Sequence, residues 1–284
     1  MYWTFVVPRN VYLQLNKQAV ERSTLVATIL YLHAHPDDES MLTAGSMARA
    51  KANGDRVILV TSTNGEEGEY PEGFVSSKEE LAEVRRKEVA ASAAIIGVDR
   101  LVLLGYHDSG MAGTEANSNP AAYCNADLEE VAKRVAEIIK EEGVDVIVGY
   151  DSNGGYGHPD HIMVHKVAVR AAEITGVPCF QATMNRDFMN EMMKMAAESG
   201  EFDGLSEDER PSGEFGTPEA QLDTFIDVAD YVDVKKRSLE VHKSQQLGVD
   251  FVFKLTDEQL RMGFGTEWMI SPNFGDGNRR TWMA

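Results

Sequence analysis

Two short clusters of histidine and aspartate contain the residue types that metal-assisted hydrolysis requires. The first cluster is His-Pro-Asp-Asp-Glu at residues 35–39, and the second is His-Pro-Asp-His at residues 158–161. Two imidazoles and one carboxylate form a three-ligand site that leaves a position open for water, which is typical of catalytic rather than structural zinc. His35, Asp38 and His161 can supply such a site.

The other ionisable groups of the two clusters suit proton transfer. Asp37, His158 and Asp160 are left as acid–base groups beside the metal, and hydrolysis by a metal-activated water needs such groups. Each cluster alone has a simpler structural interpretation, because aspartates after a proline often cap a helix. Both clusters in one chain favour catalysis. His33 and His165 are predicted to be structural, since one alternates into a strand and the other lies a helical turn beyond the second cluster.

Each cluster follows a predicted strand, so the fold must bring two strand ends together. Between residues 24 and 183 apolar, β-rich runs alternate with amphipathic helical patterns, which is the signature of βαβ units and a parallel sheet. Loops after parallel strands emerge at the carboxyl edge, where open α/β folds bind ligands. The two clusters can therefore converge. The predicted strands are residues 25–34, 56–63, 100–106, 144–150 and 177–183.

Two segments between these strands have the spacing of amphipathic helices. In residues 126–143 apolar residues recur at helical spacing, and acidic residues stand at the start, where the helix dipole favours anions. Residues 78–97 show a similar pattern and end in Gly97, which suits a helix C-terminus. We expect both helices to cover the sheet.

After residue 183 the regular alternation ends. The Met-rich residues 184–200 are predicted to form a helix, and methionines at helical spacing are more often core than substrate wall. The polar stretch 201–220, which contains Gly and Pro, is predicted to be a loop or lid that influences substrate choice. A last helix is predicted over residues 232–245, and a short tail follows it.

These patterns predict an α/β fold with a Rossmann-like, mostly parallel sheet flanked by helices. The less regular C-terminal region is expected to form part of the pocket. A length of 284 residues allows one large domain. We predict an N-terminal arm at residues 1–23 and a single α/β domain at residues 24–284.

Composition narrows the class of partner. A formal net charge of -19 argues against nucleic-acid binding, which requires a basic surface, and favours a small-molecule partner. Cys124 and Cys179 are far apart in the sequence and are predicted to be buried, apolar and unpaired. No apolar run is long enough for a bilayer, and the N-terminus lacks the pattern of a secretory signal. We therefore expect a cytoplasmic protein without integral membrane association, which could form a homo-oligomer.

The two clusters resemble the markers of the LmbE/PIG-L family of de-N-acetylases, an Ala-His-Pro-Asp-Asp-Glu block and a later His-Pro-Asp-His block. Both blocks are complete here, at residues 34–39 and 158–161. The similarity extends from the first strand to the last helix. The residues around the motifs most resemble the actinobacterial branch of the mycothiol-pathway deacetylase and amidase. The further matching segments are residues 85–88, 108–111, 150–161 and 242–245.

The resemblance implies a metal centre with a carboxylate base. His35, Asp38 and His161 are implied to bind zinc, and Asp37 is implied to act as the general base on the metal-activated water. Ferrous iron is an alternative, because it can also occupy a site of two histidines and one carboxylate.

The resemblance also implies roles for groups beside the metal. His158 would be a protonated partner that stabilises the oxyanion or protonates the leaving amine. Asp160 would orient His158 and keep its pKa high. Tyr156 would be a mobile donor to the oxyanion.

Two further residues are implied to bind hydroxyl groups of the substrate. These residues are Arg85 and Asp108, and Arg86 could replace Arg85 if the helix is rotated from the expected orientation. The implied substrate is a small amino sugar.

The implied activity is hydrolysis of the N-acyl amide, in the first instance N-acetyl, of a glucosamine-type sugar or sugar conjugate by a zinc-activated water. A mycothiol-conjugate amidase or another C–N hydrolase is the alternative. A catalytically silent sugar-binding protein is less favoured, because a pure binder has no use for both Asp37 and His158. A lipid-linked substrate is disfavoured by the missing membrane segment.

Overall fold

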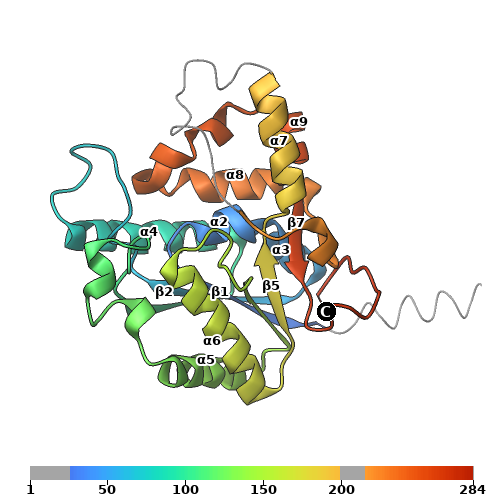
Figure 1. Ribbon diagram of the computed structural model, residues 1–284, viewed down its shortest axis with the longest axis horizontal. Helices are drawn as coiled ribbons and strands as arrows, with labels where there is room; N and C mark the ends of the chain where they lie inside the picture. Colours follow the sequence, from blue (N-terminus) through green and yellow to red (C-terminus); the bar gives the residue numbers. More distant parts are fainter. Residues whose placement is uncertain (1–25, 199–214, 284) are drawn as a thin grey trace, which may run out of the picture.

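The computed structural model of the chain describes residues 26–198 and 215–283 (Figure 1). The predicted arm at residues 1–23 and most of the predicted loop at residues 201–220 lie outside the described residues. The strands are β1 Thr28–His33, β2 Arg56–Thr63, β3 Arg100–Tyr106, β4 Val146–Tyr150, β5 Cys179–Thr183, β6 Thr224–Asp227 and β7 Thr266–Ile270. The helices are α2 Asp38–Leu42, α3 Ala44–Asn53, α4 Lys78–Ile96, α5 Leu128–Glu142, α6 Pro159–Thr175, α7 Arg186–Glu198, α8 Val232–Glu240 and α9 Asp257–Phe264.

The strands form one mixed sheet in the order β3-β2-β1-β4-β5-β7-β6. Neighbours among β1 to β5 are parallel, whereas β7 is antiparallel to both β5 and β6. The chain leaves β1 toward β2 and later returns to β4 on the other side of β1. Open α/β sheets bind ligands at such a reversal of strand order, which lies here at the carboxyl ends of β1 and β4.

Side chains of β1 alternate between two hydrophobic cores on opposite faces of the sheet. Leu30 and Leu32 pack with residues of α5 and α6, whereas Ile29 and Tyr31 pack with residues of α3 and α4. All four side chains are fully buried. A parallel strand that is covered on both faces has a continuous apolar sequence, as β1 does. Figure 1 shows α5 and α6 on one side of the sheet and α4 and α8 on the other.

The sequence predicted the first five strands and the helices at residues 78–97 and 126–143. α4 ends at Ile96 and is followed by its C-cap Gly97, which has a φ of 89°, and α5 begins after Asp127, whose side chain accepts a hydrogen bond from the backbone of Glu130. The helix predicted over residues 232–245 is wrong beyond Glu240. The chain leaves α8 there because His242 has non-helical backbone angles, and its side chain turns toward the buried core.

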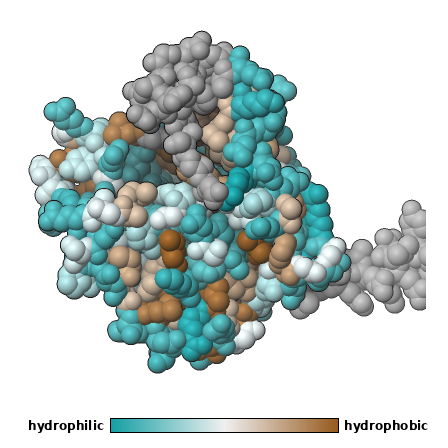
Figure 2. Space-filling model, viewed as in Figure 1, coloured by the Kyte–Doolittle hydropathy of each residue, from teal (hydrophilic) through white to brown (hydrophobic). Residues whose placement is uncertain are grey.

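The exterior and the cysteines complete the description. Figure 2 shows hydrophilic residues over much of the visible face, with apolar residues in several small groups. Within the two described ranges, no helix has the length and apolar character needed to cross a membrane. Both cysteines are free, and Cys179 is buried, but the prediction of burial is wrong for Cys124, which is only partly covered. Cys124 lies in a short 3-10 turn at Tyr123–Asn125 rather than in the sheet.

Candidate active site

The two predicted clusters meet at the carboxyl ends of β1 and β4. The first cluster leads from β1 into α2, and the second forms the start of α6. His158 is the N-cap of α6, and Pro159 is in the first turn of the helix. Proline is tolerated there because a backbone N–H at this position would have no acceptor within the helix. This helix start places Asp160 and His161 on the inner side of the first turn, where both are fully or almost fully buried.

The side chains of His35, Asp38 and His161 form a compact group at this edge, which we call the donor triangle; Asp38 faces His35 with Oδ2 and His161 with Oδ1. His35 Nδ1 lies 3.2 Å from His161 Nε2, and Asp38 oxygens lie 3.5 Å from His35 Nδ1 and 3.3 Å from His161 Nε2. Ligands about 2.0–2.1 Å from a tetrahedral zinc ion lie about 3.3 Å from one another. The three side chains are therefore close enough to one another to share one tetrahedral ion, with a fourth position left for another ligand.

The remaining nitrogen of each imidazole in the triangle has a partner of its own. His161 Nδ1 lies 3.1 Å from the carbonyl oxygen of Gly154, and His35 Nε2 lies 3.2 Å from Asp160 Oδ2. Such outer hydrogen bonds orient metal-ligating histidines and fix which nitrogen faces the ion. Both rings are therefore held with the correct nitrogen toward the triangle.

Further possible ligands surround the triangle more loosely. Donor atoms of His35, His158 and His161 lie within 4.8 Å of one another, as do those of a second group that adds Asp108 and Asp160 to His35 and His158. Separations of 3.2 and 3.5 Å also join His35 Nε2 to Asp160 and Asp108, so the choice of His35, Asp38 and His161 as the ligand set stays a prediction. The described residues thus support a site for a divalent metal ion.

The charge distribution favours a cation at the triangle. Burial alone would lower the pKa of His35, but the carboxylates of Asp108, Asp160 and Asp38 outweigh burial and hold that pKa well above its usual value. Burial would likewise raise the pKa of Asp38, but His161 and His35 keep it well below its usual range. This part of the protein is therefore built to stabilise positive charge, as a metal site must be.

Asp37 stands beside the triangle in an unusual backbone conformation. Its φ is 126°, the one positive value among non-glycine residues in the described part of the chain. Arg85 Nη2 donates a hydrogen bond of 3.0 Å to Asp37 Oδ1 and one of 2.5 Å to the carbonyl oxygen of Pro36. Burial raises the pKa of Asp37, and the Arg85 guanidinium opposes that rise. A carboxylate with a raised pKa is a stronger base than an exposed one.

The predicted relation between Asp160 and His158 is wrong. The Asp160 carboxylate contacts His35 Nε2 and accepts hydrogen bonds from the backbone N–H, at 2.9 Å, and the hydroxyl of Ser109. His158 Nδ1 instead accepts the backbone N–H of Asp160 at 3.2 Å, because His158 caps α6. Burial and the imidazoles of His35 and His161 lower the pKa of His158 to about 4. His158 is therefore neutral near neutral pH, with its proton on Nε2.

Tyr156 belongs to a tight turn that Asp151 holds in place. Asp151 Oδ1 accepts the backbone N–H groups of Asn153 and Gly155, at 2.8 and 3.0 Å. A side chain at Gly154 would lie 2.4 Å from His161 Cβ, so the turn can approach the site only with glycine there. The Tyr156 hydroxyl lies 3.5 Å from His161 Nε2, and the residue is 39% exposed. Tyr156 therefore borders the site and faces solvent.

The residues predicted to bind substrate hydroxyls lie at the site but have protein partners. Arg85 is 3% exposed, and its three hydrogen bonds go to Asp37, Pro36 and Gly65. Arg86 points elsewhere, to Asn64 and Glu83, so the alternative assignment is not favoured.

Asp108 also has protein partners. It accepts the backbone N–H of Gly110 at 2.8 Å and lies 3.5 Å from His35. Roles for Arg85 and Asp108 in substrate binding stay predictions.

Sequence reasoning missed residues that hold the site together. Ser109 fixes Asp160, and Asp151 fixes the turn that carries Tyr156. Both residues lie inside segments whose sequence resembles the family, so that similarity was the available signal. His33 and His165 are structural, as predicted, because both hydrogen-bond to Tyr150.

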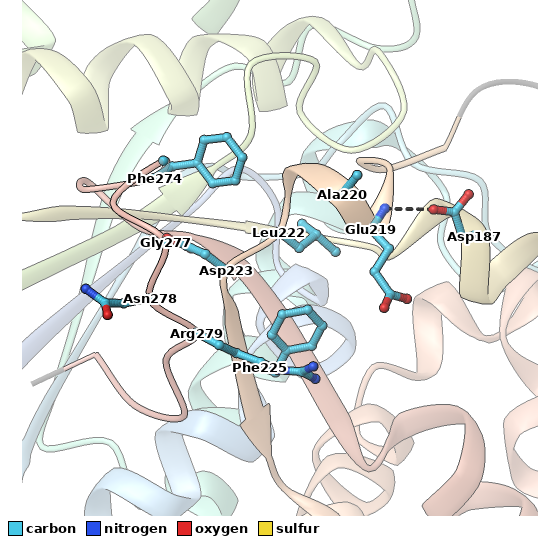
Figure 3. Close-up of a pocket in the computed structure, with 11 residues that line it drawn as sticks. Asp187, Glu219, Ala220, Leu222, Asp223, Phe225, Phe274, Gly277, Asn278 and Arg279 are labelled. Atoms are coloured by element: carbon cyan, nitrogen blue, oxygen red, sulfur yellow. Dashed lines mark hydrogen bonds between the residues drawn. The ribbon is translucent and has the colours of Figure 1, made fainter.

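A hollow of about 650 Å³ lies elsewhere and contains none of the predicted site residues. Figure 3 shows its lining, which comes from the start of α7, the approach to β6 and the C-terminal tail. The Arg279 guanidinium lies 3.7 Å from the centre of the Phe225 ring. Among the described residues, the groups that could hold a metal ion include none of this lining and lie at the β1–β4 edge.

Comparison with known proteins agrees with this geometry. Residues 30–172, which include every member of both clusters, match the family described as PIG-L, GlcNAc-PI de-N-acetylase. The chain is 38% identical over 263 residues to a 1D-myo-inositol 2-acetamido-2-deoxy-α-D-glucopyranoside deacetylase of Acidothermus cellulolyticus, covering 87% of this chain and 89% of the relative.

Solved structures share the fold. An N,N'-diacetylchitobiose deacetylase from Pyrococcus horikoshii has a TM-score of 0.57 at 21% identity, with 98% of each chain covered. GalB, the 4-carboxy-2-hydroxymuconate hydratase of Pseudomonas putida KT2440, has a TM-score of 0.57 at 16% identity, with 87% of this chain and 96% of GalB covered. The sequence match, the two complete clusters and the shared fold together show that the chain belongs to the PIG-L family of de-N-acetylases.

Proposed function

We propose that this chain is a metal-dependent hydrolase that removes the acetyl group from the amino nitrogen of a glucosamine-type sugar conjugate. The observation that carries the proposal is the triangle of donor atoms on His35, Asp38 and His161, with sides of 3.2 to 3.5 Å, next to the Asp37 carboxylate. A ligand set and a base in this relation are what metal-assisted amide hydrolysis needs.

His35, Asp38 and His161 would hold the metal ion, for which we propose zinc, with ferrous iron as the alternative. When bound, such an ion supplies Lewis acidity, which polarises a carbonyl group and lowers the pKa of water. Asp160 orients His35 from behind, and Gly154 orients His161. The chain itself therefore sets the direction from which the amide must approach.

Asp37 takes a proton from the attacking water. Its raised pKa lets it hold that proton and then pass it to the amine that leaves. Arg85 keeps the carboxylate aimed at the site through the 3.0 Å hydrogen bond to Oδ1. One carboxylate thus serves both proton transfers.

His158 and Tyr156 stabilise the carbonyl oxygen as it gains negative charge. With Nδ1 committed to the backbone of Asp160, His158 carries its proton on Nε2 and donates a hydrogen bond from there. Tyr156 adds a second donor from the turn at residues 151–157. Donors aimed at developing charge are worth about 10²–10³-fold in rate each.

The substrate proposal rests on the named relatives. The curated relative from Acidothermus cellulolyticus acts, by its name, on an inositol-linked N-acetylglucosamine. We therefore propose this glycoside as the substrate to test first. GalB has the same fold and a different reaction, so support for deacetylation comes from the matched clusters rather than from the fold.

A product assay tests the function directly. Metal-loaded protein would be incubated with N-acetylglucosamine, its inositol glycoside and a mycothiol conjugate, and acetate and free amine would be measured. We expect equal amounts of acetate and amine from the inositol glycoside, and none from the His161→Ala variant. Amine without acetate from the mycothiol conjugate would indicate an amidase, and no turnover of any substrate would contradict the proposal.

Three further expectations, on location, assembly and domain organisation, belong to the same proposal. A cytoplasmic location and homo-oligomer formation stay predictions, which cell fractionation and light scattering would test. One domain at residues 24–284 also stays a prediction, and limited proteolysis would test it.

A further inference from the structure

We propose that Glu39 and His242 form a buried clamp that holds the backbone of Asp37 in its catalytic conformation, with Ser92 as a third member. This inference rests on the proposed function, in which Asp37 is the base. The three members of the clamp are positioning residues, because they act through the backbone N–H of Asp37 and, in the described part of the chain, form no hydrogen bond with its carboxylate. The clamp also accounts for two segments that the reaction leaves unused, the last residue of the first cluster and residues 242–245.

The hydrogen bonds of Glu39 carry the first step. Glu39 is fully buried, and a buried carboxylate is tolerated only when donors surround it. Its Oε2 accepts the backbone N–H of Asp37 at 2.9 Å. Its Oε1 accepts His242 Nε2 at 2.7 Å and the Ser92 hydroxyl at 2.5 Å. One carboxylate therefore joins the base to α4 and to the C-terminal region.

The backbone of Asp37 shows why a clamp is needed. A φ of 126° is sparsely populated for any residue with a side chain and persists only where the surroundings enforce it. Two anchors enforce it here: Glu39 holds the backbone N–H, and Arg85 holds the side chain. Without the first anchor, the backbone can relax while Arg85 still binds the carboxylate, and the base then points in a different direction.

His242 reaches Glu39 because the chain breaks its helix just before it. The next turn is fixed by Ser244, whose N–H and hydroxyl both donate to the buried Glu88 of α4, at 2.9 and 2.6 Å. His242 is fully buried, and its Nδ1 has no hydrogen-bond partner in the described structure. A buried nitrogen without a hydrogen-bond partner lowers the stability of the folded protein, so stability alone would favour another side chain at this position. Its presence points to a requirement at Glu39.

The test compares four variants of the metal-loaded, full-length protein, of which His242→Gln tests rescue. His242→Leu removes the donor to Glu39, and Ser92→Ala removes another donor with little change in volume. Lys235→Met is the control, because it breaks a different buried ion pair, Lys235 to Glu267 at 2.5 Å, and a hydrogen bond of 3.0 Å to the Met41 carbonyl of α2, but no bond of Glu39 or Asp37. Bound metal, Tm, kcat and KM would be measured for each.

We expect His242→Leu to lower kcat by about 10- to 100-fold, because displacing a catalytic base by about 1 Å has an effect of that size. KM and bound metal should stay close to wild type. His242→Gln, which keeps a donor, should recover most of the rate, and Ser92→Ala should show a smaller loss. Lys235→Met should lower Tm without lowering kcat. An unchanged kcat in both His242→Leu and Ser92→Ala would overturn the proposal.

A structural readout separates the clamp from the proposed reaction. Crystal structures of wild type, Ser92→Ala and His242→Leu would give the Asp37 backbone angles whatever the substrate is. We expect Asp37 to keep a positive φ in wild type and to lose it in His242→Leu. Loss of that φ together with inactive wild-type protein would contradict the function but support the clamp. An unchanged Asp37 in both variants would overturn the clamp.

Discussion

The parallel strands β1 to β5 and the C-terminal region with β6, β7 and α8 contribute differently to this protein. Every atom of the donor triangle, and the base beside it, follows β1 or β4. The C-terminal region supplies none of these atoms. It supplies buried polar side chains that reach into the first region, such as Glu267, which accepts the backbone N–H groups of Gly45 and Ser46 at the start of α3.

The difference separates chemistry from support. The register of a sheet fixes the relative positions of residues at the ends of its strands. Here the parallel pairing of β1 and β4 places the two clusters next to each other. Support from a later region can hold that site without touching the substrate. Changes in the first region should therefore lower bound metal or rate, whereas changes in the second should lower stability, and should lower the rate only where a side chain such as His242 positions Asp37.

The largest effect is expected from removing a ligand in the first region. His161→Ala should lose the bound metal and fall to background turnover, because two donors cannot replace the triangle. Metal content by mass spectrometry and acetate release would be measured. Chelation of the wild-type protein should reproduce the loss, and added zinc should restore wild type but not the variant. A fully metal-loaded His161→Ala protein would break the assignment.

The next effect concerns the base. Asp37→Asn should lower kcat by about 100- to 10,000-fold while the metal stays bound, since one positioned base contributes this much. Asparagine is a fair control for geometry, because it tolerates positive φ better than most residues. Steady-state kinetics and metal analysis would be compared with wild type. Turnover within a few fold of wild type would remove Asp37 from the mechanism.

A smaller effect on function, but a clear one on stability, is expected in the C-terminal region. Lys235→Met leaves Glu267 buried without its partner and should destabilise the protein by about 3–5 kcal/mol. The exposed pair of Lys254 and Asp250 offers a matched control, since Lys254→Met should change stability by less than about 1 kcal/mol. Denaturant unfolding would measure both. A lower kcat for folded Lys235→Met protein would contradict the expectation that this change affects stability alone.

The smallest effect is expected from thiol labelling, which probes how closed the first region is. Burial raises the pKa of Cys179 to about 12, so almost none of it is thiolate at pH 8. A thiol reagent should therefore label the partly covered Cys124 alone in native protein, and both cysteines after denaturation. Rapid labelling of Cys179 in native protein would show that the sheet opens at β5.

Sequence patterns predicted the first region well because its strands are long, apolar and followed by amphipathic helices. The strand at residues 56–63 was predicted with both of its ends. β6 has four residues, and β7 carries Glu267, a buried charge that has meaning only as a partner of α3 and Lys235. No local pattern could reveal those two strands, because their stability comes from the rest of the sheet.

The same contrast applies inside the site. The ligand types and the spacing of the clusters can be read from the chain, and the structure brings these residues together. The direction of a side chain in the first turn of a helix cannot be read from the chain. The sequence therefore did not predict that the Asp160 carboxylate contacts His35 rather than His158. The positive φ of Asp37 was missed for a similar reason, because it depends on Glu39 and Arg85 from other directions.

The pairing of His35 with His161 has a consequence for how the protein folds. The two rings are 126 residues apart in the chain, so a metal ion bound by both would be captured only after β1 and β4 have paired and α6 has started. Contacts of such long sequence separation form late and slow the search for the native state. Metal uptake would then mark completion of the sheet, and a bound ion would act as a long-range brace that slows unfolding.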